Sequence, residues 1–302
     1  MEKDNLEKVL NELDLTDKEK RKVYQAILKS KDKINLMITG ATGSGKSSTI
    51  NAMFNTEVAK VGIGVDPETM DIQKYELGNL ILWDSPGLGD GEKKDKQHSK
   101  NIEDKLNEKD FDGNALIDLV LVILDGGSRD LGTSYELINN IIIPNLGEKP
   151  HKRILIAINQ ADMAMKGRYW NHKTNMPEKK LEEFLDEKVK SVKNRVKEAT
   201  NVDIEPIYYS AGFKEEDEQQ PPYNLSKLLS FIINYTPKNK RVHFIKEINK
   251  DVITTSTGKE EEESQKKINK SFGEAIVDVV VKVVEKVVDT AVNFVKSLCF
   301  WC

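Results

Sequence analysis

The sequence of 302 residues predicts an α/β fold, in which a mostly parallel sheet of six strands is flanked by helices and extended by helical segments at both ends. Short apolar runs alternate with longer amphipathic segments, which is the pattern of strands connected by crossover helices. Two of the runs, 116–124 and 153–159, are mostly apolar, as strands buried on both faces of a parallel sheet are. A glycine-rich loop also joins the first strand-like run to the first helical segment of this region.

The order of the elements follows from where these patterns change. Residues 1–33 carry apolar residues at helical spacing and are expected to form one or two short amphipathic helices. Gly78-Asn79 separates two strand-like runs and is typical of a hairpin turn. The expected elements of the sheet region are strand 34–39, helix 46–54, hairpin strands 72–77 and 80–83, strand 116–124, helix 134–143, strand 153–159, helix 177–199, strand 204–210 and helix 225–235.

Beyond Pro237 the composition changes twice. Residues 237–270 are polar and are expected to be a linker or a solvated helix, whereas residues 271–302 begin with a valine-rich stretch. Polar residues recur in this stretch with a period of about 3.67 residues per turn, which predicts a helix with one narrow polar stripe. Three roles for this helix stay open: packing on the rest of the chain, pairing with a second subunit, or contact with a membrane.

Charge and cysteine content narrow the class of protein. The 46 Lys and Arg residues against 50 Asp and Glu give a net charge of −4, which excludes a globally basic protein that coats nucleic acid, and no specific nucleic-acid motif is present. The two cysteines, Cys299 and Cys302, cannot build a disulfide framework and favour a reducing compartment. The charged N-terminus lacks the apolar core of a signal peptide, and no uncharged apolar run reaches ~18 residues. We expect a cytoplasmic protein, at most peripheral to a membrane.

The glycine-rich loop has the pattern of a phosphate-binding loop. The first strand runs into Gly40-Ala41-Thr42-Gly43-Ser44-Gly45-Lys46-Ser47, which matches G-x-x-x-x-G-K-[ST] between a strand and a helix. Its glycines let backbone N–H groups point at phosphate oxygens, and the following helix N-terminus adds a favourable dipole. Lys46 is expected to neutralise the β- and γ-phosphates and Ser47 to bind Mg²⁺. The loop predicts a nucleoside triphosphate site without specifying the base.

Three later segments predict that the base is guanine. Asp84-Ser85-Pro86-Gly87 matches D-x-x-G, in which Asp84 would hold Mg²⁺ through water and the Gly87 N–H would meet the γ-phosphate. Asn159-Gln160-Ala161-Asp162 matches N-K-x-D except at its second position, and the Asp162 carboxylate can accept both N1–H and N2–H₂ of guanine. Ser210-Ala211-Gly212 ends the last strand, where the Ala211 N–H could meet guanine O6. All three segments follow predicted strands, and ligands bind at that edge of parallel sheets.

A threonine that closes over Mg²⁺ and the γ-phosphate is expected between the first helix and the second strand. Thr69 is the better candidate, because Thr56 lies close to the end of the first helix. The alternative is that Thr69 is an ordinary residue at the start of a strand.

These motifs resemble the Era-like branch of the P-loop GTPases (TrmE-Era-EngA-septin-like), and more closely the bacterial YfjP/YeeP-type predicted GTPases. The resemblance extends over roughly residues 34–235 and rests on the stretches GATGSGKSSTINAMF, VGIGVDPETMDI, LWDSPGLGDG, DLVLVILDGGSRDLGTSYELI, RILIAINQADMAMKGRYW and YYSAG. With it, the chain divides into N-terminal helices (1–33), a G domain (34–236), a polar linker (237–270) and a valine-rich helix (271–302).

The resemblance implies a Mg²⁺-dependent GTPase that hydrolyses GTP to GDP and phosphate as a molecular switch. The expected catalytic groups are Lys46, Thr69 and Gly87. The resemblance implies nucleotide contacts in the phosphate loop, in D-x-x-G and in the base motifs. It implies that two side-chain hydroxyls and one nearby carboxylate contact the metal. These residues are, for the nucleotide, Gly43, Ser44, Gly45, Lys46, Ser47, Ser48, Asp84, Gly87, Asn159, Asp162, Ser210 and Ala211, and for Mg²⁺, Ser47, Thr69 and Asp84.

Two residues depart from the motifs of that family. Gln160 replaces the lysine whose aliphatic stem packs along the base, so we expect guanine selectivity to survive with reduced affinity. Leu88 stands where Ras-like proteins place a glutamine that orients the attacking water. Because leucine cannot hydrogen-bond that water, slow intrinsic hydrolysis is expected.

Other residues and other functions stay open at this point. Arg129 or Asp130 could assist hydrolysis across a dimer, and Asp90 or His98 could assist it within the segment after D-x-x-G, but the favoured interpretation of each is a solvated loop residue. The terminal Cys299-x-x-Cys302 favours an apolar tail over a metal or redox site, since structural zinc normally has four ligands. The rival functions are a nucleotide-dependent interaction module with negligible turnover and a dynamin-like, membrane-associated GTPase acting through the C-terminal helix. A homodimer, through the G domain or that helix, fits either.

Overall fold

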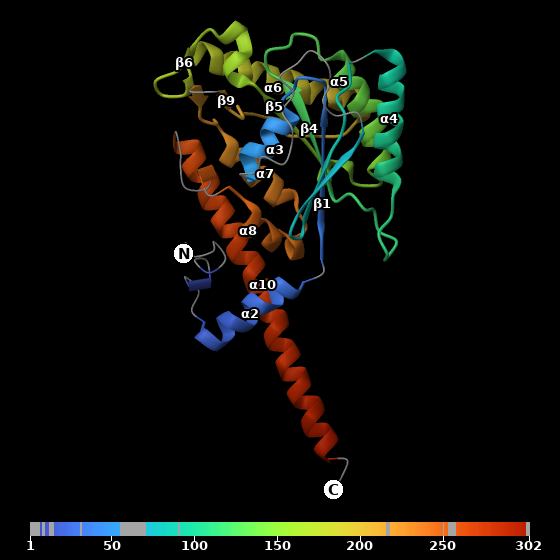
Figure 1. The fold of residues 1–302 in the computed structure, drawn as a ribbon, viewed down its shortest axis with the longest axis vertical. Helices are drawn as coiled ribbons and strands as arrows, with labels where there is room; N and C mark the ends of the chain where they lie inside the picture. The colour runs from blue at the N-terminus through green and yellow to red at the C-terminus, as the bar shows by residue number, and fades with distance from the viewer. Residues whose placement is uncertain are drawn as a thin grey trace.

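A sheet of six strands forms the centre of the molecule (Figure 1). The computed structural model describes residues 7, 10–11, 15–30, 32–54, 71–89, 91–215, 218–249, 251–252 and 258–299, with the side chains of the last helix up to Lys282. The strand order is β2-β3-β1-β4-β5-β8, and all neighbours are parallel except the hairpin β2–β3. The predicted α/β fold is therefore confirmed. The strands are β1 (Ile34–Gly40), β2 (Gln73–Leu77), β3 (Leu80–Asp84), β4 (Leu119–Asp125), β5 (Ile154–Asn159) and β8 (Ile207–Tyr208).

Helices cover both faces of the sheet. Leu36 and Ile38 of β1 belong to a core cluster with α2, α3, α7 and α10, whereas Met37 belongs to a second cluster with α4 and α6. Successive side chains of a strand point to opposite faces, so this alternation divides the core into two layers. The helices are α2 (Asp17–Lys29), α3 (Lys46–Phe54), α4 (Glu92–Asn107), α5 (Gly132–Glu136) with the π-helix η1 (Leu137–Ile142) and η2 (Ile143–Asn145), α6 (Lys179–Thr200), α7 (Leu225–Tyr235), α8 (Phe244–Glu247) and α10 (Lys259–Cys299).

Helix α4 is a feature that the sequence did not predict. Its 16 residues are mostly polar, and only His98, Ile102 and Leu106 are buried. These three lie four residues apart, so a single narrow stripe packs against the sheet while the rest of the helix faces solvent. The interpretation of His98 as a solvated loop residue was wrong, because its side chain is only 3% exposed and lies within a helix.

The last strand is shorter than expected. Only Ile207 and Tyr208 pair with β5, within the predicted range 204–210. Pro206 has no N–H to donate to a neighbouring strand. At the other end, Ser210 exchanges two backbone hydrogen bonds with Tyr223, at 2.9 Å each. The backbone after β8 therefore turns away from the sheet at the edge where the base motifs meet.

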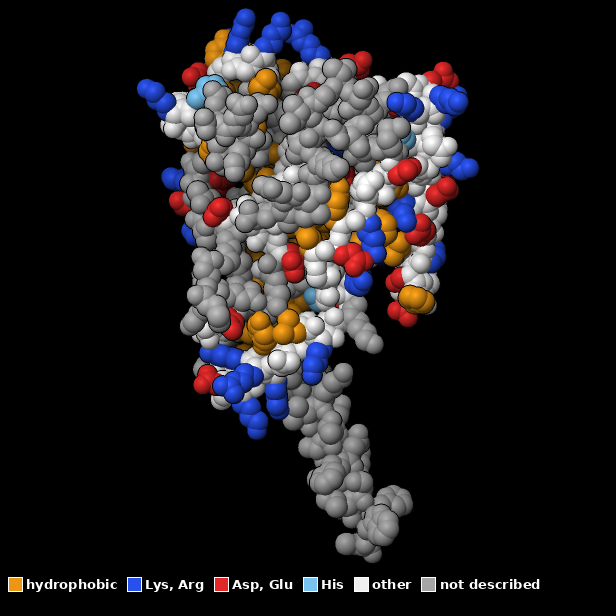
Figure 2. Space-filling model, viewed as in Figure 1, with side chains coloured by type: hydrophobic (Ala, Val, Ile, Leu, Met, Phe, Trp, Pro, Cys, Tyr) orange, Lys and Arg blue, Asp and Glu red, His pale blue; other side chains and the backbone are white. Residues whose placement is uncertain are grey.

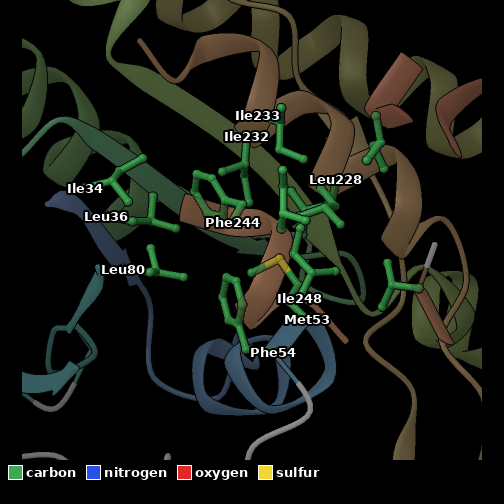
Figure 3. Packing of buried hydrophobic residues seen from close by; sticks show 14 of the residues in the cluster. Ile34, Leu36, Met53, Phe54, Leu80, Leu228, Ile232, Ile233, Phe244 and Ile248 are labelled. Atoms are coloured by element: carbon green, nitrogen blue, oxygen red, sulfur yellow. The ribbon is translucent and has the colours of Figure 1, made fainter. Parts of the chain in front are cut away.

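The stretch expected as a polar linker carries buried helices. The 3₁₀-helix η5 (Lys238–His243) and α8 follow α7, and Phe244 is completely buried. Figure 3 shows Phe244 and Ile248 packed among Met53 and Phe54 of α3. Apolar side chains spaced through a polar composition therefore anchor residues 238–248 to the G domain.

Helix α10 begins inside the expected linker and continues through the valine-rich stretch without a break. It packs on α7, η5 and α2, and it extends past α2 away from the sheet (Figure 1). Within the described side chains, Val277 and Val281 are 48% and 47% exposed. In the described part of the chain, no helix combines the length and the apolar character that crossing a bilayer requires.

Candidate nucleotide-binding site

The phosphate loop follows β1 and is shaped by two close backbone approaches. A Cβ at Gly40 would lie 2.1 Å from the Ile123 carbonyl oxygen, and one at Gly45 would lie 2.2 Å from Nδ2 of Asn159. Both distances are far shorter than atoms tolerate, and both residues have positive φ angles of 149° and 85°. Only glycine fits at these positions, which explains their place in the motif.

Lys46 lies inside this loop. It is the first residue of α3 and only 8% exposed, and its Nζ donates to the carbonyl oxygens of Gly40 at 3.3 Å and Ala41 at 3.0 Å. The loop therefore holds the ammonium group where it can face a phosphate. Ser44 Oγ is buried and has no hydrogen-bond partner among the described atoms. Ser47 and Ser48 follow in the first turn of α3, both half-buried.

The expected metal site brings together a hydroxyl and a carboxylate. Ser47 Oγ donates to Oδ2 of Asp84 at 3.4 Å. Burial raises the pKa of Asp84 to about 6, against the opposing effects of Lys46 and Ser47. The Oδ1 atom of Asp84 is buried without a hydrogen-bond partner among the described atoms. A buried carboxylate oxygen beside a serine hydroxyl offers the hard oxygen donors that Mg²⁺ prefers, so the residues fit the ion.

Three expected residues cannot be placed in this geometry. Thr69, Thr56 and Asp90 lie outside the residues that the structure describes. Arg129 and Asp130 are described and exposed, on the loop that follows β4.

Asn159 joins the phosphate loop to both base motifs. It is 2% exposed, its Nδ2 donates to the Ser44 carbonyl at 3.0 Å, and its Oδ1 accepts from the Ala211 N–H at 3.0 Å. Three segments that are distant in sequence are thus tied to one side chain. The Ala211 amide, which the sequence assigned to guanine O6, is the group that holds Asn159 here.

The other base residues lie around Asn159. Asp162 is 8% exposed in the 3₁₀-helix η4 (Ala161–Gly167), directly after β5. Gln160 has a left-handed φ of 59°, and its Nε2 donates to the Gly43 carbonyl at 2.8 Å. Ser210 Oγ accepts from the Gly212 N–H at 3.3 Å, which closes a tight turn after β8. The side chain of Gln160 therefore contacts the phosphate loop even though it lacks the lysine stem.

The D-x-x-G segment is docked on the phosphate loop. A Cβ at Gly87 would lie 2.4 Å from Thr42 Oγ1 and 2.6 Å from the Thr42 backbone nitrogen, so glycine is required. The Thr42 N–H donates to the Leu88 carbonyl at 2.9 Å. The Leu88 side chain is 4% exposed and belongs to the core cluster that contains Met37 and Ile102. Leu88 thus anchors the segment and does not present a polar group to a water molecule.

Two contacts that support the site escaped the sequence analysis. Lys188 of α6 donates to the carbonyl oxygens of Asp125, Gly126 and Ser128, at 3.1, 2.7 and 2.6 Å, and burial lowers its pKa. The fully buried Tyr209 places its hydroxyl 2.6 Å from Thr49 Oγ1 of α3. A lysine on an amphipathic helix and a tyrosine directly after β8 carry no local signal for these long-range contacts.

Part of the chain matches a known protein family and several curated proteins. Residues 35–160 match the family model described as 50S ribosome-binding GTPase. Interferon-gamma-inducible GTPase 10 of Mus musculus is 26% identical over 223 residues, which are 70% of this chain and 46% of that protein. The uncharacterized protein YfjP of Escherichia coli (strain K12) is 30% identical over 131 residues, 42% of this chain and 41% of that protein. The chain thus spans less than half the length of these curated relatives.

Two solved structures show partial similarity to this chain. An Era variant of Aquifex aeolicus bound to GDP.AlF4- has a TM-score of 0.42 at 20% identity, over 67% of this chain and 56% of its own. Toc33 from Arabidopsis thaliana in complex with Mg²⁺ and GMPPNP has a TM-score of 0.44 at 16% identity, over 67% of this chain and 82% of its own.

The family match covers the phosphate loop, D-x-x-G and the start of N-x-x-D, and the three motifs meet at one edge of the sheet as described above. Over residues 35–160 the chain is therefore similar to a family of P-loop GTPases, and it carries the phosphate-loop and D-x-x-G motifs at the positions described above.

Proposed function

We propose that the protein binds GTP with Mg²⁺ and hydrolyses it to GDP and phosphate as a molecular switch. The observation that carries this proposal is the double contact of Asn159, to the Ser44 carbonyl and the Ala211 N–H. It joins a loop built for phosphates to the two segments that would read guanine. An ATP site has no need of a buried carboxylate such as Asp162 at this place, because adenine offers no pair of donors to it.

Each group has a distinct task in the proposed reaction. Lys46 and the backbone N–H groups from Gly43 to Ser48 hold the phosphates and offset the charge that develops on the γ-phosphate. Ser47 and Thr69 would hold Mg²⁺, with Asp84 oriented toward it through water. When bound, the ion neutralises charge on the β- and γ-phosphate oxygens. Gly87 and Thr69 would couple the presence of the γ-phosphate to the position of their loops.

Hydrolysis is expected to be slow in the isolated protein. The Leu88 side chain is buried in the core, so it cannot orient the attacking water. This burial favours a second candidate, a nucleotide-dependent interaction module with negligible turnover. The two differ in whether phosphate is released at all.

Phosphate release from the purified full chain tests the proposal. With GTP and Mg²⁺, wild-type protein should release phosphate slowly, and Lys46→Ala should abolish release because the loop loses its only side-chain cation for the phosphates. Lys18→Ala, an exposed lysine on α2, is the matched control and should behave as wild type. Equal release by wild type and Lys46→Ala would point to a contaminating enzyme and would contradict the proposal. Binding of GTP without turnover would support the interaction module.

A specific observation also favours contact with an anionic membrane. Helix α2, which α10 crosses, exposes Lys18, Arg21, Lys22 and Lys29 along one side. Figure 2 shows Lys and Arg side chains gathered at this end of the molecule. The exposed Val277 and Val281 lie on α10. A basic surface on α2 and exposed valines on α10, which packs against it, fit a bilayer with acidic headgroups. The basic surface adds net positive charge, whereas the charges within the valine-rich segment roughly balance.

Sedimentation of the full chain with lipid vesicles tests this contact. We expect binding to vesicles that contain phosphatidylserine and not to purely zwitterionic ones, and Val277→Asp with Val281→Asp should abolish it. Equal recovery of the protein with both vesicle types would remove the membrane role. A cytoplasmic protein that forms a homodimer through the G domain or α10 would then be favoured, and its mass in solution would report this.

A further inference from the structure

Histidine 98 contacts the segment that would sense the γ-phosphate. Its Nδ1 lies 3.1 Å from the Gly87 carbonyl oxygen, and its side chain is buried at 3% exposure. Because a carbonyl oxygen only accepts, His98 donates through an Nδ1–H. The residue belongs to the buried stripe of α4 that also contains Ile102 and Leu106. A helix of the second core layer is thereby linked to the D-x-x-G motif, and two residues further on the Gly89 N–H donates to Asp95 Oδ1 of the same helix at 2.9 Å.

The backbone on the other side of Gly87 is held as well. The Leu88 N–H donates to the Gly40 carbonyl at 3.4 Å, and the Leu88 carbonyl accepts from the Thr42 N–H at 2.9 Å. The Leu88 side chain is buried in the core cluster of α4. The peptide between Gly87 and Leu88 therefore has three anchors: the phosphate loop, the core and the His98 ring.

Holding this peptide in place matters because glycine has a wider range of backbone conformations than the other residues of the motif. Glycine loses more backbone freedom on ordering than any other residue. The His98 contact holds the Gly87 carbonyl in one orientation. It thereby limits rotation about the ψ angle of Gly87, which sets the direction of the Gly87 N–H relative to the peptide that leads to Leu88. An amide that is already aimed binds a phosphate oxygen without a further entropic cost.

We propose that His98 is a positioning residue that aims the Gly87 amide at the γ-phosphate and couples its occupancy to α4. The inference rests on the proposed GTP site, since Gly87 has this role only there. By linkage, a γ-phosphate that binds better to the aimed amide also favours the position of α4 that His98 holds. GDP lacks the γ-phosphate, so its binding should not favour this position of α4.

The test compares His98→Leu with His98→Asn in the full chain. The first removes the donor and keeps an apolar side chain, whereas the second keeps a donor near the position of Nδ1. The dissociation constants of GDP and GMPPNP with Mg²⁺ and the kcat for GTP are measured for each variant. For His98→Leu we expect an unchanged GDP affinity, and about five- to tenfold losses in GMPPNP affinity and kcat, the size of one hydrogen bond. His98→Asn should recover most of both losses.

Other outcomes overturn the inference in distinct ways. Equal losses for GDP and GMPPNP would mean that His98 is only a packed core residue, and no loss for either would mean that the contact has no role. If wild type binds no guanine nucleotide, the proposed function itself fails. Should His98→Leu fail to fold, His98→Gln takes its place, because its donor lies near Nε2 and not near Nδ1. Equal behaviour of the Asn and Gln variants would then refute the role of Nδ1.

Discussion

Gln160 donates from its side-chain Nε2 to the Gly43 carbonyl oxygen across 2.8 Å. The contact links the base motif to the phosphate loop on its exposed side, while Asn159 links the same two segments on the buried side. The residue that departs from the lysine usual in the motif thus keeps a polar contact to the loop, and what it lacks is the longer aliphatic stem.

Substitutions at Gln160 should separate these two contributions. Gln160→Ala removes both the hydrogen bond and the side chain that could cover the base, and should weaken GDP binding about fivefold. Gln160→Lys supplies a longer apolar stem and a donor, and should bind GDP more tightly than wild type. Titration calorimetry with GDP and Mg²⁺ measures both, with Gln25→Ala on α2 as the remote control. A weaker Gln160→Lys would show that the amide itself is required.

Asn159 should be essential to the stability of the site before any nucleotide binds. Asn159→Ala leaves the Ser44 carbonyl and the Ala211 N–H without their partner, which should cost about 1–3 kcal/mol of unfolding free energy. Asn159→Asp keeps an acceptor for Ala211 and loses the donor to Ser44. Urea denaturation without nucleotide measures the loss. Wild-type stability of Asn159→Ala would mean that the three segments are held together by other contacts.

Asp84 should destabilise the nucleotide-free protein at neutral pH. Its pKa is raised from 3.8 to about 6, so the folded state holds the proton more tightly than the unfolded state does. The ionised carboxylate therefore costs stability above pH 6, roughly 3 kcal/mol, and the cost disappears as the pH falls to about 4. Asp84→Asn should unfold at higher urea concentration than wild type at pH 8, and the gap should narrow toward pH 4.

The same variant should lose its response to magnesium. Wild type should bind GDP more tightly as Mg²⁺ is added, whereas Asp84→Asn should bind it with little dependence on the ion. A variant that is less stable than wild type at pH 8, or that keeps its full Mg²⁺ response, would remove Asp84 from the assigned role.

His243 should make the fold sensitive to mild acid. It is 5% exposed, and its Nδ1 lies 3.2 Å from Nδ2 of Asn79, which donates to it. Burial lowers the pKa of His243, and Lys240 acts in the same direction while Asp32 opposes it. The folded state thus prefers the neutral ring, and stability should fall as the pH drops below about 6.5, where the unfolded chain takes up the proton.

The matched variant for this prediction is His243→Asn, which keeps an acceptor for Asn79 but cannot titrate in this range. Between pH 7.5 and 5.5, wild type should lose about 1 kcal/mol more unfolding free energy than the variant does. Parallel pH profiles of the two proteins would show that the ring does not titrate between the folded and unfolded states.

Local patterns were sufficient for much of the fold. The sequence predicted α3 over 46–54 and α7 over 225–235, and both have these bounds, because an apolar helical face is a strong local signal. It missed α4, whose buried stripe has only three residues and includes His98. The sequence also predicted a polar linker after Pro237 and did not predict that Phe244 is buried there, because its partners on α3 are distant in sequence.

The candidate site likewise contains residues that local motifs predict and contacts that they do not. The phosphate loop, Asp84, Asn159 and Asp162 could be proposed for the site from sequence because each motif encodes its own backbone shape and follows a strand. The contacts of Lys188 with the loop after β4, and of His98 with Gly87, depend on helices that pack from elsewhere in the chain. Such contacts have no spacing signal, so only the folded structure reveals them.

The nucleotide preference of Asp162→Asn tests the central claim most directly. An aspartate accepts two donors from guanine, whereas an asparagine can donate to the C2 oxygen that xanthine carries in place of the amino group. Calorimetric titration with GDP and XDP in Mg²⁺ should show wild type preferring GDP by at least about a hundredfold, and Asp162→Asn preferring XDP. No saturable binding to wild type, or a variant that keeps the preference for GDP, would contradict the account.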